Sequence, residues 1–136
     1  MLGSYFLQTN HLRWELLLPA SGIGCLTVAV LNINNMRDHE PDAQSGKKTL
    51  VVRIGIDWAK RYHFILNFVG ILFIILYSIP EIKSVWFFLV GFILFIKPSR
   101  EILRHKNHKL FDPYLKKQAI GTFLFSILFV VGLIVA

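Results

Sequence analysis

The sequence predicts an all-α fold, a multi-pass transmembrane bundle of four helices preceded by a helical stub. The first supporting observation is an apolar excess: 54% of the 136 residues are hydrophobic, whereas soluble domains are usually about 45–50% apolar. The second is that four long stretches carry no charged residue, namely 16–31, 64–79, 85–96 and 118–136. The third is that the basic residues gather between these stretches. We treat residues 1–136 as a single transmembrane domain.

Each uncharged stretch can be extended to the roughly 17–25 residues that a spanning helix needs, because Trp, Tyr, His and Lys flank it. We therefore predict helices near 12–33, 62–79, 82–97 and 117–136. The third has the shortest uncharged stretch and spans only if Ile82 and Lys83 are included. At the N-terminus, Met1–Leu7 is apolar, too short to span, and has neither the basic region nor the cleavage site of a signal peptide. We expect it to be the end of a helix.

The basic residues predict the orientation. Of the 15 Lys and Arg residues, six lie in 32–61 and seven in 97–117. With four helices these two segments fall on the same face, and the positive-inside rule makes that face cytoplasmic in the cell (inner) membrane. Because the positive charges lie at helix ends, we expect the partner of this basic chain to be the lipid bilayer and not nucleic acid.

Two further features of the sequence give little support for a function. Residues 45–49, Ser-Gly-Lys-Lys-Thr, resemble the end of a phosphate-binding P-loop, but that motif requires glycine at the position occupied by Pro41. Cys25 is the single cysteine, so no disulfide forms within the chain, and we expect it to pack in mid-helix.

The polar segment 32–61, which we call the motif loop, is the strongest functional candidate. Asn34, Asp38 and Asp42 are spaced four residues apart, which would stack them on one helical face. Pro41 disfavours helix at Glu40, and this leaves open whether Asp42 shares that face or lies in a turn. Ionisable groups beside a membrane helix are expensive and usually functional. Two carboxylates backed by carboxamides suit Mg²⁺, which shares phosphate oxygens and water as ligands.

Positive charge follows directly, at Lys47, Lys48 and Arg53. Carboxylates followed by cations at a membrane face are the chemistry that holds a magnesium-bridged diphosphate. The alternative is a solvated loop whose charges have no common role.

The stretch Asn34–Gly55, NNMRDHEPDAQSGKKTLVVRIG, resembles the second aspartate-rich motif of the UbiA-type membrane prenyltransferases. Within that family it is most similar to the branch that prenylates 1,4-dihydroxy-2-naphthoate in the menaquinone pathway. The resemblance implies a ring of about nine helices in which two such motifs hold Mg²⁺ and the diphosphate of a polyprenyl donor. It implies the metal-binding, catalytic carboxylates Asp38 and Asp42, and the diphosphate-binding residues Lys47, Arg53, Arg37, Asn34 and Asn35.

The family's first motif, of Asn-Asp-x-x-Asp type, is absent from this sequence. We therefore expect the chain to be the C-terminal half of a Mg²⁺-dependent prenyltransferase, inactive alone and partnered by an N-terminal half. The predicted reaction moves a polyprenyl group from an allylic diphosphate to an aromatic acceptor. Two alternatives are another branch of the family, such as 4-hydroxybenzoate polyprenyltransferase, and a non-catalytic membrane subunit that binds a cation.

Overall fold

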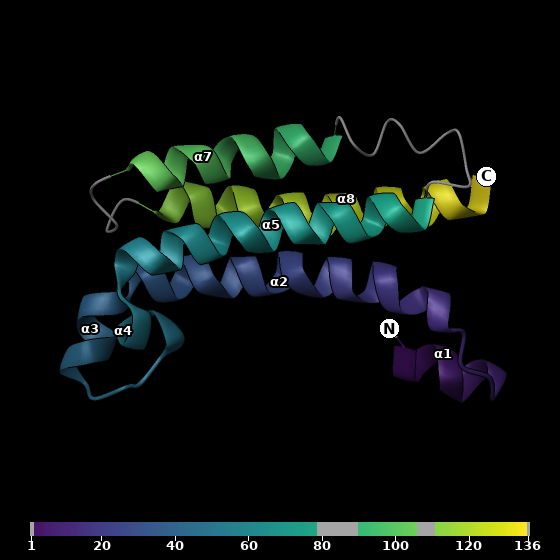
Figure 1. Ribbon diagram of the computed structural model, residues 1–136, viewed down its shortest axis with the longest axis horizontal. Coiled ribbons are helices and arrows are strands. Elements are labelled where there is room, and N and C mark those ends of the chain that lie inside the picture. The colour runs from purple at the N-terminus through teal and green to yellow at the C-terminus, as the bar shows by residue number, and fades with distance from the viewer. Residues whose placement is uncertain (1, 79–89, 106–110, 136) are drawn as a thin grey trace.

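The computed structural model describes residues 2–78, 90–105 and 111–135, and these ranges are helical apart from short connections (Figure 1). No β-strand occurs within them, so the all-α prediction is confirmed. The elements are α1 (Leu2–Thr9), η1 (Trp14–Leu16), α2 (Leu17–Arg37), α3 (His39–Gln44), α4 (Leu50–Ile54), α5 (Ile56–Ser78), η3 (Phe92–Ile96), α7 (Lys97–Arg104) and α8 (Asp112–Val135).

Three of the described helical segments are long and apolar enough to cross a membrane, namely Trp14–Arg37, Ile56–Ser78 and Asp112–Gly132. At about 1.5 Å per residue each exceeds the ~30 Å hydrocarbon core. The chain is therefore a multi-pass membrane protein. The predicted helix at 82–97 falls largely on 79–89, which lie outside the described residues. Its remainder is helical and runs through the π-helical turn η3 into α7.

The spanning helices extend further than predicted, because the charged residues that flank the apolar stretches are helical as well. The helix predicted at 12–33 is preceded by the short 3₁₀ turn η1, and α2 continues to Arg37. The helix predicted at 62–79 begins already at Ile56, and the one predicted at 117–136 begins at Asp112. An acid in the first turn favours both early starts through the helix dipole.

The motif loop at 32–61 is consequently not a loop. It comprises the last turns of α2, the short helices α3 and α4, and the first turns of α5. Pro41 lies in the first turn of α3, where a missing N–H is tolerated, so Asp42 is helical. Figure 1 shows α3 and α4 together at one end of the bundle, at the opposite end from α1.

Helices α2 and α5 form the closest helix pair, and two glycines allow it. A Cβ added at Gly22 would lie 2.8 Å from the carbonyl oxygen of Gly70, and one at Gly70 would lie 2.9 Å from that of Gly22. Small residues that let backbones approach this closely are typical of helix packing in membranes. The long axes of α2, α5, α7 and α8 run alongside one another (Figure 1).

The interior contains two apolar clusters. The first is Leu26, Ile71, Ile74, Phe95, Ile96, Phe125 and Phe129. The second, nearer α3 and α4, is Ile33, Met36, Val51, Ala59, Ile102 and Phe111. Four buried polar side chains lie between the two apolar clusters. They are His63 and Asn67 on α5, Ser99 on α7 and Gln118 on α8. We call these four residues the polar layer.

Candidate functional site

The predicted site residues lie where the chain leaves α2 and winds through α3 and α4 before entering α5. Two glycines of the motif permit this path, since Gly46 has a φ of 76° and Gly55 a φ of 81°, and both values lie in the left-handed region that other residues avoid. Gly46 follows α3 and Gly55 ends α4. Thr49 caps α4 by accepting a hydrogen bond from the Val52 amide at 3.2 Å.

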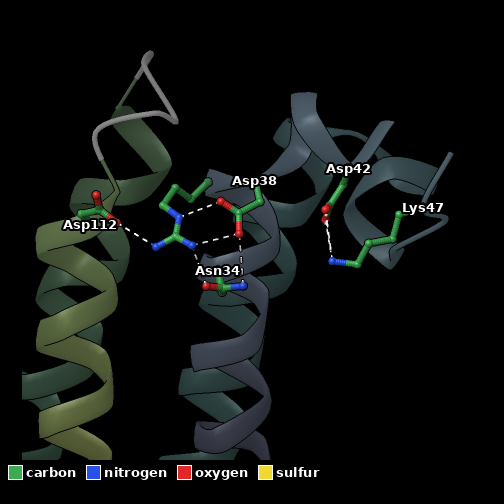
Figure 2. Close-up of polar contacts among 6 residues, drawn as sticks. Asn34, Asp38, Asp42, Lys47 and Asp112 are labelled. Carbon is green, nitrogen blue, oxygen red and sulfur yellow. Dashed lines mark hydrogen bonds and ion pairs between the residues drawn. The ribbon is translucent and has the colours of Figure 1, made fainter. Parts of the chain in front are cut away.

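At the end of α2, Arg37 and Asp38 form a two-pronged ion pair (Figure 2). Arg37 donates from Nε to Asp38 Oδ1 at 2.8 Å and from Nη2 to Asp38 Oδ2 at 2.9 Å. Asn34, one turn earlier, accepts from Arg37 Nη2 at 3.0 Å and donates to Asp38 Oδ2 at 3.4 Å. Such forked Arg–carboxylate pairs fix geometry as well as adding energy. The predicted contact between Asn34 and Asp38 is present.

Asp42 has a different partner. Its two carboxylate oxygens accept hydrogen bonds from Lys47 Nζ at 3.1 and 3.3 Å. The Asp42 side chain is 11% exposed, whereas that of Lys47 is 60% exposed. Figure 2 shows Asp38 and Asp42 turned to separate cations. Asp42 still continues the turn, since its amide donates to the Asp38 carbonyl at 2.9 Å.

The electrostatics keep Asp38 ionised. Hydrogen bonds from Arg37 hold the pKa of the Asp38 carboxyl below its ordinary value, and the charge of Lys47 acts in the same direction. Both carboxylates are thus bound by side chains of the same motif.

The remaining predicted residues form no side-chain hydrogen bond or ion pair with Asp38 or Asp42 among the described residues. Asn35 is half-buried on α2, whereas Lys48 and Arg53 are exposed to solvent. Exposed cations at this position are available to an anion that approaches the end of the bundle. We define the charged cluster as Asn34, Arg37, Asp38, Asp42, Lys47 and Asp112.

Asp112 is the member of the charged cluster that the sequence does not predict. It is the first residue of α8, and its Oδ1 accepts a hydrogen bond from Arg37 Nη1 at 2.9 Å (Figure 2). Nothing in the local sequence pairs two residues 75 positions apart. The available signal was the Asp-Pro pair at 112–113, which is typical of a helix start and would have placed an acid on the same membrane face as the motif.

The polar layer was also missed. Asn67 is fully buried at its centre: its amide nitrogen lies 3.0 Å from His63 Nε2 and donates to Ser99 Oγ at 3.0 Å. Its carbonyl oxygen accepts from Gln118 Nε2 at 2.7 Å. Nearby, the buried Lys60 donates to the His105 carbonyl at 2.9 Å. Polar residues scattered along otherwise apolar helices gave no spacing signal.

The donor set suits a hard divalent cation in part. Asp38 and Asp42 offer carboxylate oxygens, and Asn34 and Asn35 offer carboxamides, the oxygen ligands that Mg²⁺ accepts. Across residues 2–78, 90–105 and 111–135, however, no group of three or more His, Cys, Asp or Glu side chains could hold a metal ion. The described residues thus offer two carboxylates of the type that Mg²⁺ accepts, each paired with a cation of the motif.

Sequence comparisons find relatives of this chain. The model of the UbiA prenyltransferase family matches residues 1–113. Over 98% of its length the chain is 38% identical to the 1,4-dihydroxy-2-naphthoate octaprenyltransferase of Escherichia coli (strain K12), and 36% identical to the protein of that name from Haemophilus influenzae. It is 26% identical to a Drosophila melanogaster UbiA prenyltransferase domain-containing protein 1 homolog.

The chain spans 44% of the length of each of the two bacterial relatives and 36% of the Drosophila one. No solved structure matches it significantly.

Proposed function

The chain belongs to the UbiA prenyltransferase family, and from this membership we propose that it supplies one of two diphosphate-binding segments of an aromatic polyprenyltransferase. The observation that carries the proposal is the charged cluster itself. Carboxylates and cations are held against each other at the end of spanning helices, where a lipid-soluble donor can present its diphosphate from the bilayer. We place this end of the bundle on the cytoplasmic face of the cell membrane, because the basic residues concentrate there.

In the proposed reaction the C–O bond of an allylic diphosphate breaks, and the diphosphate leaves with the electron pair. An electron-rich ring carbon of the aromatic acceptor then forms a C–C bond with the allylic cation and loses a proton, or its carboxylate as CO₂, and the electron pair of the broken bond returns to the ring. Ionisation is slow unless the charge developing on the leaving group is neutralised. Lys47, Arg53 and Arg37 are the residues we assign to that neutralisation.

Asp38 and Asp42 are assigned to a Mg²⁺ ion, which when bound supplies Lewis-acid stabilisation of the leaving diphosphate. These carboxylates would hold the ion in exchange for their hydrogen-bonded cations, which are Arg37 at Asp38 and Lys47 at Asp42. The released side chains lie where the diphosphate would arrive. These two ion pairs therefore keep both sets of charges ready in one place, without a large movement of the backbone.

Two carboxylates do not complete the coordination that Mg²⁺ requires, which is close to octahedral. We propose that a second aspartate-rich segment, on a polypeptide other than residues 1–136, supplies further ligands and the rest of the cavity. The chain's coverage of 44% of the bacterial relatives supports this. The segment would also exclude water from the allylic cation, since an open flank would expose the cation to hydrolysis.

For the acceptor we propose 1,4-dihydroxy-2-naphthoate, in menaquinone synthesis. The support is that the two bacterial relatives aligned over 98% of this chain are named for that substrate.

A reconstitution experiment tests the proposal. The chain in lipid vesicles is given an octaprenyl diphosphate, dihydroxynaphthoate and Mg²⁺, alone and after co-expression with an N-terminal segment that carries the first motif. We expect prenylated product, detected by mass spectrometry, from the pair only. Replacing dihydroxynaphthoate by 4-hydroxybenzoate should abolish the product.

Product from the chain alone would refute the two-segment proposal. Prenylation of 4-hydroxybenzoate in preference to the naphthoate would refute the acceptor assignment. A pair that folds in the membrane and prenylates neither acceptor would refute the proposed function itself.

A further inference from the structure

Arg37 is held by two acids, of which only one belongs to the motif. Its Nε and Nη2 bind Asp38, and its Nη1 donates to Asp112 at the start of α8 at 2.9 Å. Nη2 is shared with Asn34. The guanidinium thus bridges the end of α2 and the start of α8, and about a third of the Arg37 side chain is exposed.

If Asp38 binds a ligand cation, Asp38 must release Arg37, whereas Asp112 need not. Asp38 cannot accept two hydrogen bonds from Arg37 and ligate a cation through the same oxygens. A freed arginine is long and flexible, so donor binding would have to order its side chain again at an entropic cost. The bond to Asp112 uses Nη1, so it does not occupy the nitrogens, Nε and Nη2, that bind Asp38.

We propose that Asp112 is a positioning residue for donor binding. It keeps Arg37 at the charged cluster while Asp38 exchanges its partner, so that Nε and Nη2 are presented to the diphosphate. This inference rests on the proposed function, and it adds to the site a residue from the last helix, far from the motif in sequence.

A purely structural role for Asp112 is the competing explanation. An acid in the first turn stabilises a helix through its dipole wherever it lies, and Asp112 is 70% exposed, as a simple helix-end acid would be. Asp57 provides the matched control, because it lies in the first turn of the spanning helix α5 and pairs only loosely with Lys60, at 3.6 Å. A role confined to helix ends predicts the same behaviour for both acids.

The test uses the chain assembled with its N-terminal segment, in vesicles. The variants are Asp112→Asn, Asp112→Glu, Asp57→Asn, Arg37→Gln and the double variant Arg37→Gln/Asp112→Asn. Three quantities are measured: the apparent KM for the polyprenyl diphosphate, kcat, and the inhibition constant of inorganic pyrophosphate, which probes the anion site without the prenyl chain. Asp38→Asn is included as the reference for the proposed function.

We expect Asp112→Asn to raise the donor KM and the pyrophosphate inhibition constant about 5- to 20-fold, as for coupled residues in one network, with kcat changed less than about twofold. Asp112→Glu should restore most of the affinity, and Asp57→Asn should leave it unchanged. In the Arg37→Gln background, Asp112→Asn should have no further effect, because Asp112 acts through Arg37.

Equal losses from Asp112→Asn with and without Arg37 would overturn the inference in favour of a structural role at α8. Unchanged affinity in Asp112→Asn, with Asp38→Asn inactive, would overturn it while leaving the proposed function standing. An Asp38→Asn variant that retains normal turnover would overturn both.

Discussion

The charged cluster at the end of the bundle and the polar layer inside it both consist of hydrogen-bonded side chains, but under opposite conditions. The cluster is held by Arg–Asp and Lys–Asp ion pairs in which at least one partner is partly exposed, and each pair joins neighbours in the motif except at Asp112. The polar layer contains no ion pair between its members. Its side chains are almost completely buried, and hydrogen bonds centred on the Asn67 amide join three helical segments.

This difference determines what each region can do. Partly exposed ion pairs contribute only about 0–1 kcal/mol, so their partners can be exchanged for a ligand at small cost. Breaking the buried network would leave amide or hydroxyl groups unsatisfied, at about 1–3 kcal/mol each. The cluster is therefore suited to binding and release, and the layer to holding α5, α7 and α8 in register beneath it.

The largest expected effect is at the carboxylates of the cluster. Asp38→Asn and Asp42→Asn each remove a charge that we assign to the ionisation step, so turnover in the assembled enzyme should fall by about 10²- to 10⁴-fold. Initial rates of prenylated product measure this. Helix content by circular dichroism should remain that of the parent chain.

Asp57→Asn is the control, since it removes an exposed carboxylate outside the cluster, and it should retain near-parental turnover. Near-parental rates in both Asp38→Asn and Asp42→Asn would remove the cluster from the catalytic assignment.

The residues of the cluster other than Asp112 could be selected from the sequence because they are local, although their pairing, Asp38 with Arg37 and Asp42 with Lys47, was not predicted. Asn34, Arg37 and Asp38 fall within one helical turn and a little more, and Lys47 follows Asp42 by five residues. The polar layer could not, because Asn67 meets Ser99 and Gln118 across 32 and 51 positions, and only packing of the helices brings them together. Asp112 was missed for the same reason.

The fold class and the spanning segments were predictable from uncharged apolar stretches, since the bilayer imposes their length. The motif segment was predicted to be a loop that follows the first spanning helix, with Asp42 left either on the helical face of Asn34 and Asp38 or in a turn. In the structure α3 and α4 make much of that segment helical, and Gly46 and Gly55 provide the turns that follow them.

A second, smaller effect is expected in the polar layer. Asn67→Leu removes the centre of the network and leaves the Gln118 amide without its acceptor, so the free energy of unfolding should fall by about 2–3 kcal/mol. Equilibrium unfolding of the chain in detergent micelles measures it. Thr27→Ala is the control, because exposed Thr27 bonds only its own helix, to Ile23, and should change stability by less than about 0.5 kcal/mol.

Equal stability of the Asn67→Leu variant and the parent would mean that apolar packing alone sets the helix register. The polar layer would then have no role in fixing the helices, and its contrast with the charged cluster would not hold.

A third prediction concerns the close approach of α2 and α5, which supports both regions. Gly22→Ala would bring a Cβ to 2.8 Å from the backbone oxygen of Gly70, which cannot move independently, and should destabilise the chain by about 1–3 kcal/mol. Gly24→Ala, two residues along the same helix, meets nothing within 4 Å and should be neutral or slightly stabilising. The same unfolding assay compares them, and similar losses in both would point to helix propensity and not to packing.

The smallest expected effect separates cations of the site from cations that anchor the chain in the membrane. Lys47 lies in the charged cluster and Arg53 is exposed at the end of α4. We therefore expect Lys47→Ala and Arg53→Ala to raise the apparent KM for the polyprenyl diphosphate about 3- to 10-fold, as the loss of one ordinary hydrogen bond would. Lys116 and Lys117 are equally charged and exposed, but they lie in the first turns of α8, where Lys117 is 5.8 Å from the Tyr114 ring. Their alanine variants should bind the donor normally, since headgroup attraction draws on the whole basic surface.

Donor titrations at two salt concentrations make the comparison, because a diffuse field is screened by salt much more than a direct contact. Equal losses in all four variants, vanishing at high salt, would replace the defined diphosphate contacts at Lys47 and Arg53 by a general attraction of the basic face.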